Sequence, residues 1–169
     1  MTTARADGIE HGSSILGYPR IGARRELKTA LESYWHGGIS REELLTTGRE
    51  LAESTWRELA ATGLEQVPGN TFSFYDHVLD NALMFGALPR RFEPLAAELE
   101  PIDLYFALAR GKPEYPPLEL RKYFNTNYYF RQPVIDPDVE FSLDTFPMLS
   151  EWLLDEHARV TAEKMEAER

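Results

Sequence analysis

The stretch from Ser14 to Trp35 constrains the fold of this chain most, because it joins a short apolar run, a tight turn and an amphipathic pattern. Ile15 and Leu16 form the apolar run and predict a short strand. The residues that then interrupt regular structure are Gly17, Pro19 and Gly22. From Arg25 onward, apolar residues recur at the spacing of one helical face, at Leu27, Ala30, Leu31, Tyr34 and Trp35. The stretch therefore predicts a strand, a turn and a helix in succession.

Positive charge gathers where this helix is expected to begin, at Arg20, Arg24, Arg25 and Lys28. A helix N-terminus is the positive end of the macrodipole, and its first N–H groups lack partners within the helix. Cations are mildly unfavourable there unless an anion joins them, so the pattern favours a site for a phosphate or for a string of carboxylates. The alternative is a solvated helix face, helped by an ion pair between Lys28 and Glu32.

Composition and charge limit the classes of protein to which this chain can belong. The chain has 169 residues with 43% apolar and 12% aromatic residues, which is typical of a folded domain; we expect one domain over residues 13–169 after a flexible leader over residues 1–12. The net charge of −10 argues against general nucleic-acid binding. The chain has no cysteine, which excludes disulfides and thiolate zinc ligands within it. With neither a long apolar run nor an apolar leader, we expect a cytoplasmic protein without a membrane partner.

The rest of the chain continues as alternating helices and short strands. A capping box at Ser40–Glu43 begins a long helix that ends near Gly63, and Leu64–Val67 predicts a second strand. The later expected elements are a helix capped by Ser73 and stopped by Gly86, a helix over 102–111, one or two helical turns over 118–124, a strand over 127–131 and a last helix capped near Thr145. This order predicts parallel βα units.

The predicted fold class is α/β: a helix-rich, partial TIM-like (β/α) barrel with about three parallel strands. A closed (β/α)8 barrel needs about 250 residues, more than this chain has. Three strands alone would leave an edge of the sheet bare, which soluble proteins normally cover or pair. The chain is therefore expected to be a fragment or to be completed by a partner chain in a hetero-oligomer.

Four long stretches, in the same order, resemble the N-terminal part of the cobalamin-independent methionine synthase family: 16–22, 25–35, 72–80 and 122–128. This family consists of zinc methyltransferases that move a methyl group from 5-methyltetrahydropteroyl-polyglutamate to homocysteine. The likeness spans roughly residues 13–131 and continues more weakly through the last expected helix. It implies half of the first of the family's two (β/α)8 domains, the one that contributes to folate binding.

The resemblance also implies roles for particular residues. The stretch that binds the glutamate tail of the folate in the family corresponds here to Arg25, Glu26, Leu27 and Lys28, joined by Lys122. Further candidates are Arg20, Asn125 and Asn127. A glutamate tail is a string of carboxylates, so this implied role agrees with the anion site expected from the charge pattern. The implied substrate is 5-methyltetrahydrofolate polyglutamate.

The chain also departs from the family. The zinc ligands lie in the family's second domain, so we expect no catalytic residue, metal site or cofactor in this chain, and any zinc would come from a partner. The segment 68–72 lacks the usual acidic residue and the segment 127–130 lacks the usual histidine, which indicates a diverged paralogue. Tyr128, Tyr129 and Phe130 suit either a stacked pteridine or a sheet face, and His77 is expected to be structural rather than a proton relay with Asp76.

These observations lead to one main hypothesis and two alternatives. The main hypothesis is a folate-tail-binding or scaffold subunit of a split, methionine-synthase-like methyltransferase that is not catalytic alone. One alternative is a non-enzymatic docking protein derived from the same fold; the other is a truncated fragment of an ordinary methionine synthase. The sequence leaves open the methyl acceptor, the partner, the stoichiometry and whether the chain takes part in catalysis.

Overall fold

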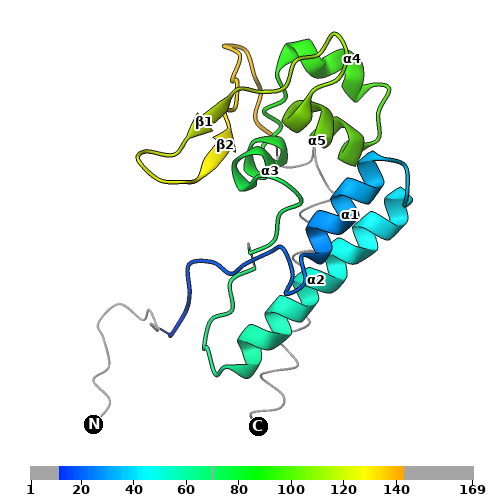
Figure 1. Cartoon of the computed structure of the whole chain (residues 1–169). Coiled ribbons are helices and arrows are strands. Elements are labelled where there is room, and N and C mark those ends of the chain that lie inside the picture. The colour runs from blue at the N-terminus through cyan, green and yellow to red at the C-terminus, as the bar shows by residue number, and fades with distance from the viewer. Residues whose placement is uncertain (1–11, 70, 143–169) are drawn as a thin grey trace, which may run out of the picture. The chain divides into compact units, whose positions relative to one another are not determined.

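The structure is a computed structural model that describes residues 12–69 and 71–142. The chain divides into two compact units, the first holding the described residues up to Phe72 and the second those from Ser73 (Figure 1). Nearly all of the leader predicted over residues 1–12, and the whole helix predicted from Thr145, lie outside the described residues. The single domain expected over 13–169 stays a prediction.

The first unit is built on a helical pair, α1 (Glu26–Trp35) and α2 (Arg41–Ala61), which pack against each other (Figure 1). Both predicted helices are confirmed. Ser40 Oγ accepts the Glu43 N–H at 3.2 Å and Glu43 Oε2 accepts the Ser40 N–H at 2.7 Å, so the capping box is present. Gly63 follows α2 with a φ of 84°, which suits a residue without a Cβ. The core side chains of the pair are Leu27, Leu31, Leu44, Ala52 and Trp56.

The two strands expected in this unit, at 15–16 and 64–67, are not formed. Leu16 is fully exposed. The two segments still meet at Ser13, whose carbonyl accepts the Gln66 N–H at 3.0 Å and whose own N–H donates to Glu65 Oε2 at 2.7 Å. One backbone bond is not a ladder, and the two-residue apolar run is too short to extend it before Gly17 intervenes. Sequence reasoning therefore found the apolar runs but overestimated their strand length.

The second unit contains the remaining helices and a small sheet (Figure 1). Its elements are α3 (His77–Met84), the 3₁₀ turn η1 (Arg90–Phe92), α4 (Glu93–Ala96), α5 (Pro101–Arg110), β1 (Leu120–Lys122) and β2 (Tyr129–Arg131). Helix α5 confirms the helix predicted over 102–111 and is buried from Ile102 to Ala109 except at Asp103. It therefore forms the centre of this unit.

Two expectations in this unit are wrong, and one is confirmed in part. The helix α3 is capped by Asp76 rather than Ser73. The segment 118–124, expected to be helical, contains β1. The strand expected over 127–131 is present as β2, but it pairs antiparallel with β1, with Arg121 opposite Phe130. The chain reverses within a short turn closed by the Tyr123 N–H and the Tyr128 carbonyl at 2.9 Å, and such a short connection permits only antiparallel pairing. None of the three segments predicted as parallel strands forms a parallel pair among residues 12–69 and 71–142, and the partial (β/α) barrel as a fold class stays a prediction.

The Tyr105 hydroxyl is the buried polar centre of the second unit. It accepts the N–H groups of Tyr75 at 3.1 Å and Asp76 at 2.8 Å, at the turn that leads into α3. Burial, and then the charge of the nearby Asp80, raise the pKa of Tyr105 well above its ordinary value. The hydroxyl therefore stays protonated and holds this turn against α5 at any working pH.

Asp76 connects the same turn to the sheet. One carboxylate oxygen accepts the N–H groups of Val78 at 2.7 Å and Leu79 at 3.2 Å, which caps α3. The other oxygen accepts the N–H of Arg131 in β2. A single buried side chain thus fixes the start of α3 and the position of β2 together.

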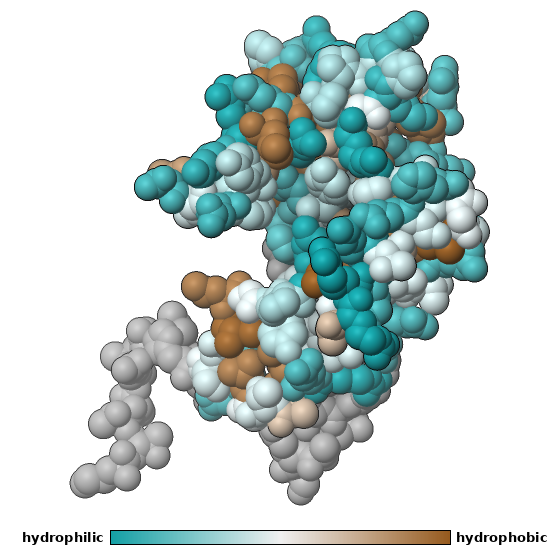
Figure 2. Space-filling view, viewed as in Figure 1, coloured by the Kyte–Doolittle hydropathy of each residue, from teal (hydrophilic) through white to brown (hydrophobic). Residues whose placement is uncertain are grey.

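The surface in Figure 2 is largely hydrophilic, with patches of apolar residues left exposed. No helix of residues 12–69 and 71–142 is both long and apolar enough to cross a membrane.

Replacing Tyr105 with phenylalanine should lower the free energy of unfolding by about 1–3 kcal/mol, because the buried Asp76 N–H then loses its acceptor. Urea titration followed by circular dichroism measures this change. Tyr115→Phe is the matched control, since it removes a hydroxyl outside this cluster and should cost less than about 0.5 kcal/mol. Equal effects of the two variants would contradict the role given to the Tyr105 hydroxyl.

Candidate anion-binding site

A tight turn sets the geometry at the start of α1. The Arg25 N–H donates to the Gly22 carbonyl at 3.1 Å, and the Leu27 N–H donates to the Ile21 carbonyl at 3.1 Å. Gly22 has a φ of 85°, and a Cβ at this position would collide with the Glu26 carboxylate. The turn therefore requires glycine at this position, and it presents Arg24 and Arg25 to solvent at the first turn of the helix.

The Glu26 carboxylate occupies the positive end of α1. Its Oε2 accepts the Arg24 N–H at 2.9 Å, and its Oε1 lies 3.2 Å from the Arg24 guanidinium. The pKa of Glu26 is lowered by its own backbone N–H, then by the Arg24 N–H, and less by the charge of Arg24. The chain thus supplies an anion of its own, and the expectation of free N–H groups is wrong for Arg24, Arg25 and Leu27. An external anion has to be held here by side chains.

Arg25 and Lys28 supply exposed cations beside this helix start. Arg25 precedes the helix in the left-handed conformation, with a φ of 66°, which costs a residue other than glycine about 1–2 kcal/mol. The Lys28 ammonium lies 3.5 Å from Glu32 Oε1, and both side chains are about half exposed, 46% and 54%. An exposed pair of this kind contributes little, so it leaves the Lys28 ammonium able to exchange Glu32 for another carboxylate.

Two other predicted site residues of the first unit are less accessible. The Leu27 side chain is fully buried and belongs to the core, so it has no surface for a ligand. Arg20 is half-buried in the segment that leads to the turn. Among the sequence-predicted site residues of the first unit, Arg25 and Lys28 are therefore the two that are exposed.

The remaining candidates lie in the second unit. Lys122 is the last residue of β1, while Asn125 and Asn127 lie in the turn between β1 and β2, and all three are exposed. The structure thus places the sequence-predicted residues in two groups, one at the start of α1 and one on the hairpin. That the two groups serve one ligand stays a prediction.

His77 and Asp76 do not form a proton relay in this structure. The Asp76 carboxylate is engaged by backbone N–H groups, whereas His77 Nδ1 faces Asp80 Oδ2 at 3.8 Å, one helical turn along α3. Among residues 12–69 and 71–142, no group of three or more His, Asp or Glu side chains is arranged to hold a metal ion, so we assign no step through zinc to them.

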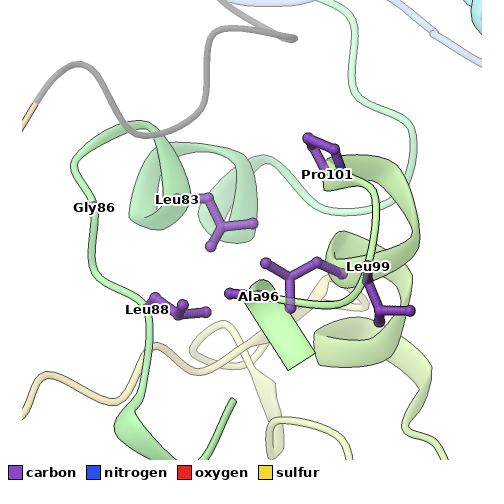
Figure 3. A pocket seen from close by; sticks show the side chains of 7 residues that line it. Leu83, Gly86, Leu88, Ala96, Leu99 and Pro101 are labelled. Carbon is purple, nitrogen blue, oxygen red and sulfur yellow. The ribbon is translucent and has the colours of Figure 1, made fainter. Parts of the chain in front are cut away.

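The second unit also holds an apolar cavity of about 270 Å³ (Figure 3). Its lining is Leu83, Gly86, Leu88, Ala96, Leu99, Pro101 and Leu104. Sequence reasoning missed it because these residues come from α3, α4, α5 and the segments between them. The lining carries no charged side chain, so this cavity does not suit a string of carboxylates.

Comparison with known proteins identifies the relatives of this chain. Residues 12–166 match the model of the family described as cobalamin-independent synthase, N-terminal domain. The chain is 43% identical over 149 residues to the 5-methyltetrahydropteroyltriglutamate–homocysteine methyltransferase of Streptomyces avermitilis, which covers 88% of this chain and 19% of that protein. The enzymes of the same name from Rhodococcus jostii and Mycobacterium tuberculosis are 48% identical over 139 residues, covering 82% of this chain and 18% of each enzyme. The chain thus spans about a fifth of the length of these relatives.

The Glu26 geometry predicts an acid-dependent contribution to stability. Since the pKa of Glu26 is lowered on folding, its contribution is complete above the pKa of the unfolded chain and is lost as pH falls through the lower folded value. Glu26→Gln should therefore destabilise the chain at about pH 7 and have a much smaller effect at about pH 3, well below the ordinary glutamate value. Urea midpoints at the two pH values measure this difference.

Glu43 provides a second, independent case, because the Ser40 N–H and hydroxyl lower its pKa as well. Glu43→Gln should show the same loss of effect in acid. A destabilisation by Glu26→Gln that is the same at both pH values would refute the role of its charge.

Proposed function

We propose, since the chain belongs to the family of cobalamin-independent methionine synthase N-terminal domains, that it binds the polyglutamate tail of 5-methyltetrahydrofolate and acts as the tail-binding or scaffold subunit of a methyltransferase. The observation that carries this proposal is the pair of exposed cations, Arg25 and Lys28, at the turn that begins α1. Exposed guanidinium and ammonium groups pair with carboxylates, which a glutamate tail carries in series.

The geometry at α1 supports a particular way of binding. Glu26 already satisfies the backbone at the helix start, so the tail would be held by the Arg25 guanidinium and the Lys28 ammonium rather than by free N–H groups. The left-handed conformation of Arg25 also supports a role in ligand binding. Such a conformation is strained for a residue other than glycine, and it is kept where the surrounding structure or a ligand requires it. The resemblance also makes Lys122, exposed at the end of β1, a candidate for binding a carboxylate of a glutamate tail.

Methyl transfer itself would require residues beyond this chain. The relatives named as homocysteine methyltransferases are about five times longer, and the present chain has no cysteine to serve as a thiolate ligand of zinc. In this proposal another polypeptide supplies the remaining strands of the barrel, any zinc site and the homocysteine chemistry. The complex would work in the cytoplasm.

The proposal predicts tail-dependent binding of a folate. The purified chain should bind 5-methyltetrahydropteroyl-triglutamate more tightly than the monoglutamate in isothermal titration calorimetry, because two further carboxylates meet the cations. Lys28→Ala and Lys122→Ala should each weaken triglutamate binding by about ten- to hundredfold, which corresponds to about 1.5–3 kcal/mol for a hydrogen bond to a charged group. Arg25→Gly should weaken it similarly without destabilising the chain, since glycine tolerates the left-handed conformation.

Arg41→Ala is the matched control for Lys28→Ala. Arg41 is also a partly exposed cation on a helix, paired with Glu42 at 3.8 Å, but it begins α2 directly after the connection from the last residue of α1, whereas Lys28 lies in the first turn of α1. Its replacement should leave triglutamate affinity unchanged. If the unaltered chain does not distinguish triglutamate from monoglutamate, the tail-binding function is refuted and the non-enzymatic docking protein becomes the better interpretation.

A further inference from the structure

The hairpin of β1 and β2 carries three cations, which differ in how far they are engaged. The Arg121 guanidinium lies 2.9 Å from Glu119 Oε2 and donates to Gln132 Oε1 at 2.7 Å. The Arg131 guanidinium donates to a backbone carbonyl at 2.8 Å. Within the part of the chain that the structure describes, the exposed Lys122 ammonium has no such partner. Lys122 is therefore the cation of the hairpin that can accept a carboxylate without giving up another bond.

The position of Lys122 depends on the strand beside it. Lys122 lies opposite Tyr129 of β2, and β1 and β2 form a two-stranded sheet in the described part of the chain. Helix α3 packs against β2 (Figure 1). An interaction that fixes β2 on α3 therefore also fixes the backbone that carries Lys122.

A single buried carboxylate makes this connection. The Asp76 residue is only 5% exposed. One of its oxygens caps α3 by accepting the N–H groups of Val78 and Leu79, and the other accepts the Arg131 N–H of β2. The register turns this Arg131 N–H away from β1, so the bond holds the outer edge of β2 and leaves the pairing of the hairpin intact. Both connections at once require a carboxylate, because an amide or a hydroxyl offers one oxygen.

We propose that Asp76 is a positioning residue for tail binding: it holds β2 to the start of α3 and thereby keeps the Lys122 ammonium in place for a carboxylate of the glutamate tail. This inference rests on the proposed function. When the backbone under Lys122 is fixed, binding has to order only the lysine side chain, whereas a loose hairpin would have to be ordered as well. Asp76 itself touches no ligand in this proposal, since its carboxylate is buried and engaged by backbone N–H groups.

Asp76→Asn tests this role because it separates the two connections. Asparagine caps helices as well as aspartate does. Its one oxygen keeps both bonds at α3 when the NH₂ group faces β2, and that group cannot accept the Arg131 N–H. Hydrogen exchange followed by NMR should show faster exchange of the Arg131 N–H and unchanged protection of the Leu79 N–H. Asp76→Ser should act in the same way, so either variant serves if the other does not fold.

A double-mutant cycle separates positioning from a general loosening of the unit. Asp76→Asn should weaken binding of 5-methyltetrahydropteroyl-triglutamate about three- to tenfold in isothermal titration calorimetry, which is part of the loss expected for Lys122→Ala. In the Lys122→Ala background it should cost less than about twofold, because the positioned cation is gone. In the Lys28→Ala background the full loss should remain, because Lys28 belongs to the first unit.

Glu43→Gln is the matched control, since it also changes a capping carboxylate into its amide, with the same change in net charge, but at the start of α2. It should leave triglutamate affinity unchanged. An equal loss from Asp76→Asn in both lysine backgrounds overturns the proposal, and so does unchanged exchange of the Arg131 N–H. If the unaltered chain prefers triglutamate and Asp76→Asn leaves that preference intact, only the positioning role is refuted; an unaltered chain without the preference refutes the proposed function itself.

Discussion

The Asp76 carboxylate is the interaction on which the second unit depends. It caps α3 with one oxygen and holds the backbone of β2 with the other, while the Tyr105 hydroxyl from α5 fixes the turn that carries it. A helix, a sheet and the central helix are therefore joined through a few buried polar atoms. Because each of these bonds lies where water cannot replace it, removing one partner leaves an unsatisfied group rather than a solvated one. The position of the hairpin, and of Lys122 on it, follows from this network.

The first unit reaches its functional geometry by a different route. Gly22 adopts a φ of 85° that side chains rarely adopt, and a Cβ there would displace the Glu26 carboxylate from the helix start. The internal carboxylate neutralises part of the positive charge that the sequence concentrates there. Neighbouring residues therefore have different roles. Leu27 packs in the core and Glu26 accepts hydrogen bonds at the helix start, while Arg25 and Lys28 remain exposed for a ligand. A four-residue stretch thus combines a structural and a binding role because successive helical residues point in different directions.

The helices of this chain were predictable because their signals are local. The capping box at Ser40, the glycine at position 63 and the apolar face of α1 each act within a few residues, and all three are present as expected. Strands were predicted less well because their formation depends on a neighbour. The run at Ile15 remains irregular with one backbone bond between neighbouring segments, whereas the segment around Arg121 becomes a strand because the chain folds back on it. The same dependence explains why Asp76, rather than Ser73, caps α3: the carboxylate is positioned by β2 and α5 as well as by its own helix.

The sequence by itself determined the family, the helices and the residue types that suit a glutamate tail, because these depend on residue identity and on spacing along the chain. Tertiary structure decided which of those residues are accessible: it buried Leu27, engaged Glu26 at the helix start and left Arg25 and Lys28 in solvent. It also decided that the aromatic run after Lys122 lies on an exposed hairpin rather than in a core. Burial and hydrogen bonding are properties of the whole fold, set by segments that are distant in sequence, so no local pattern specifies them.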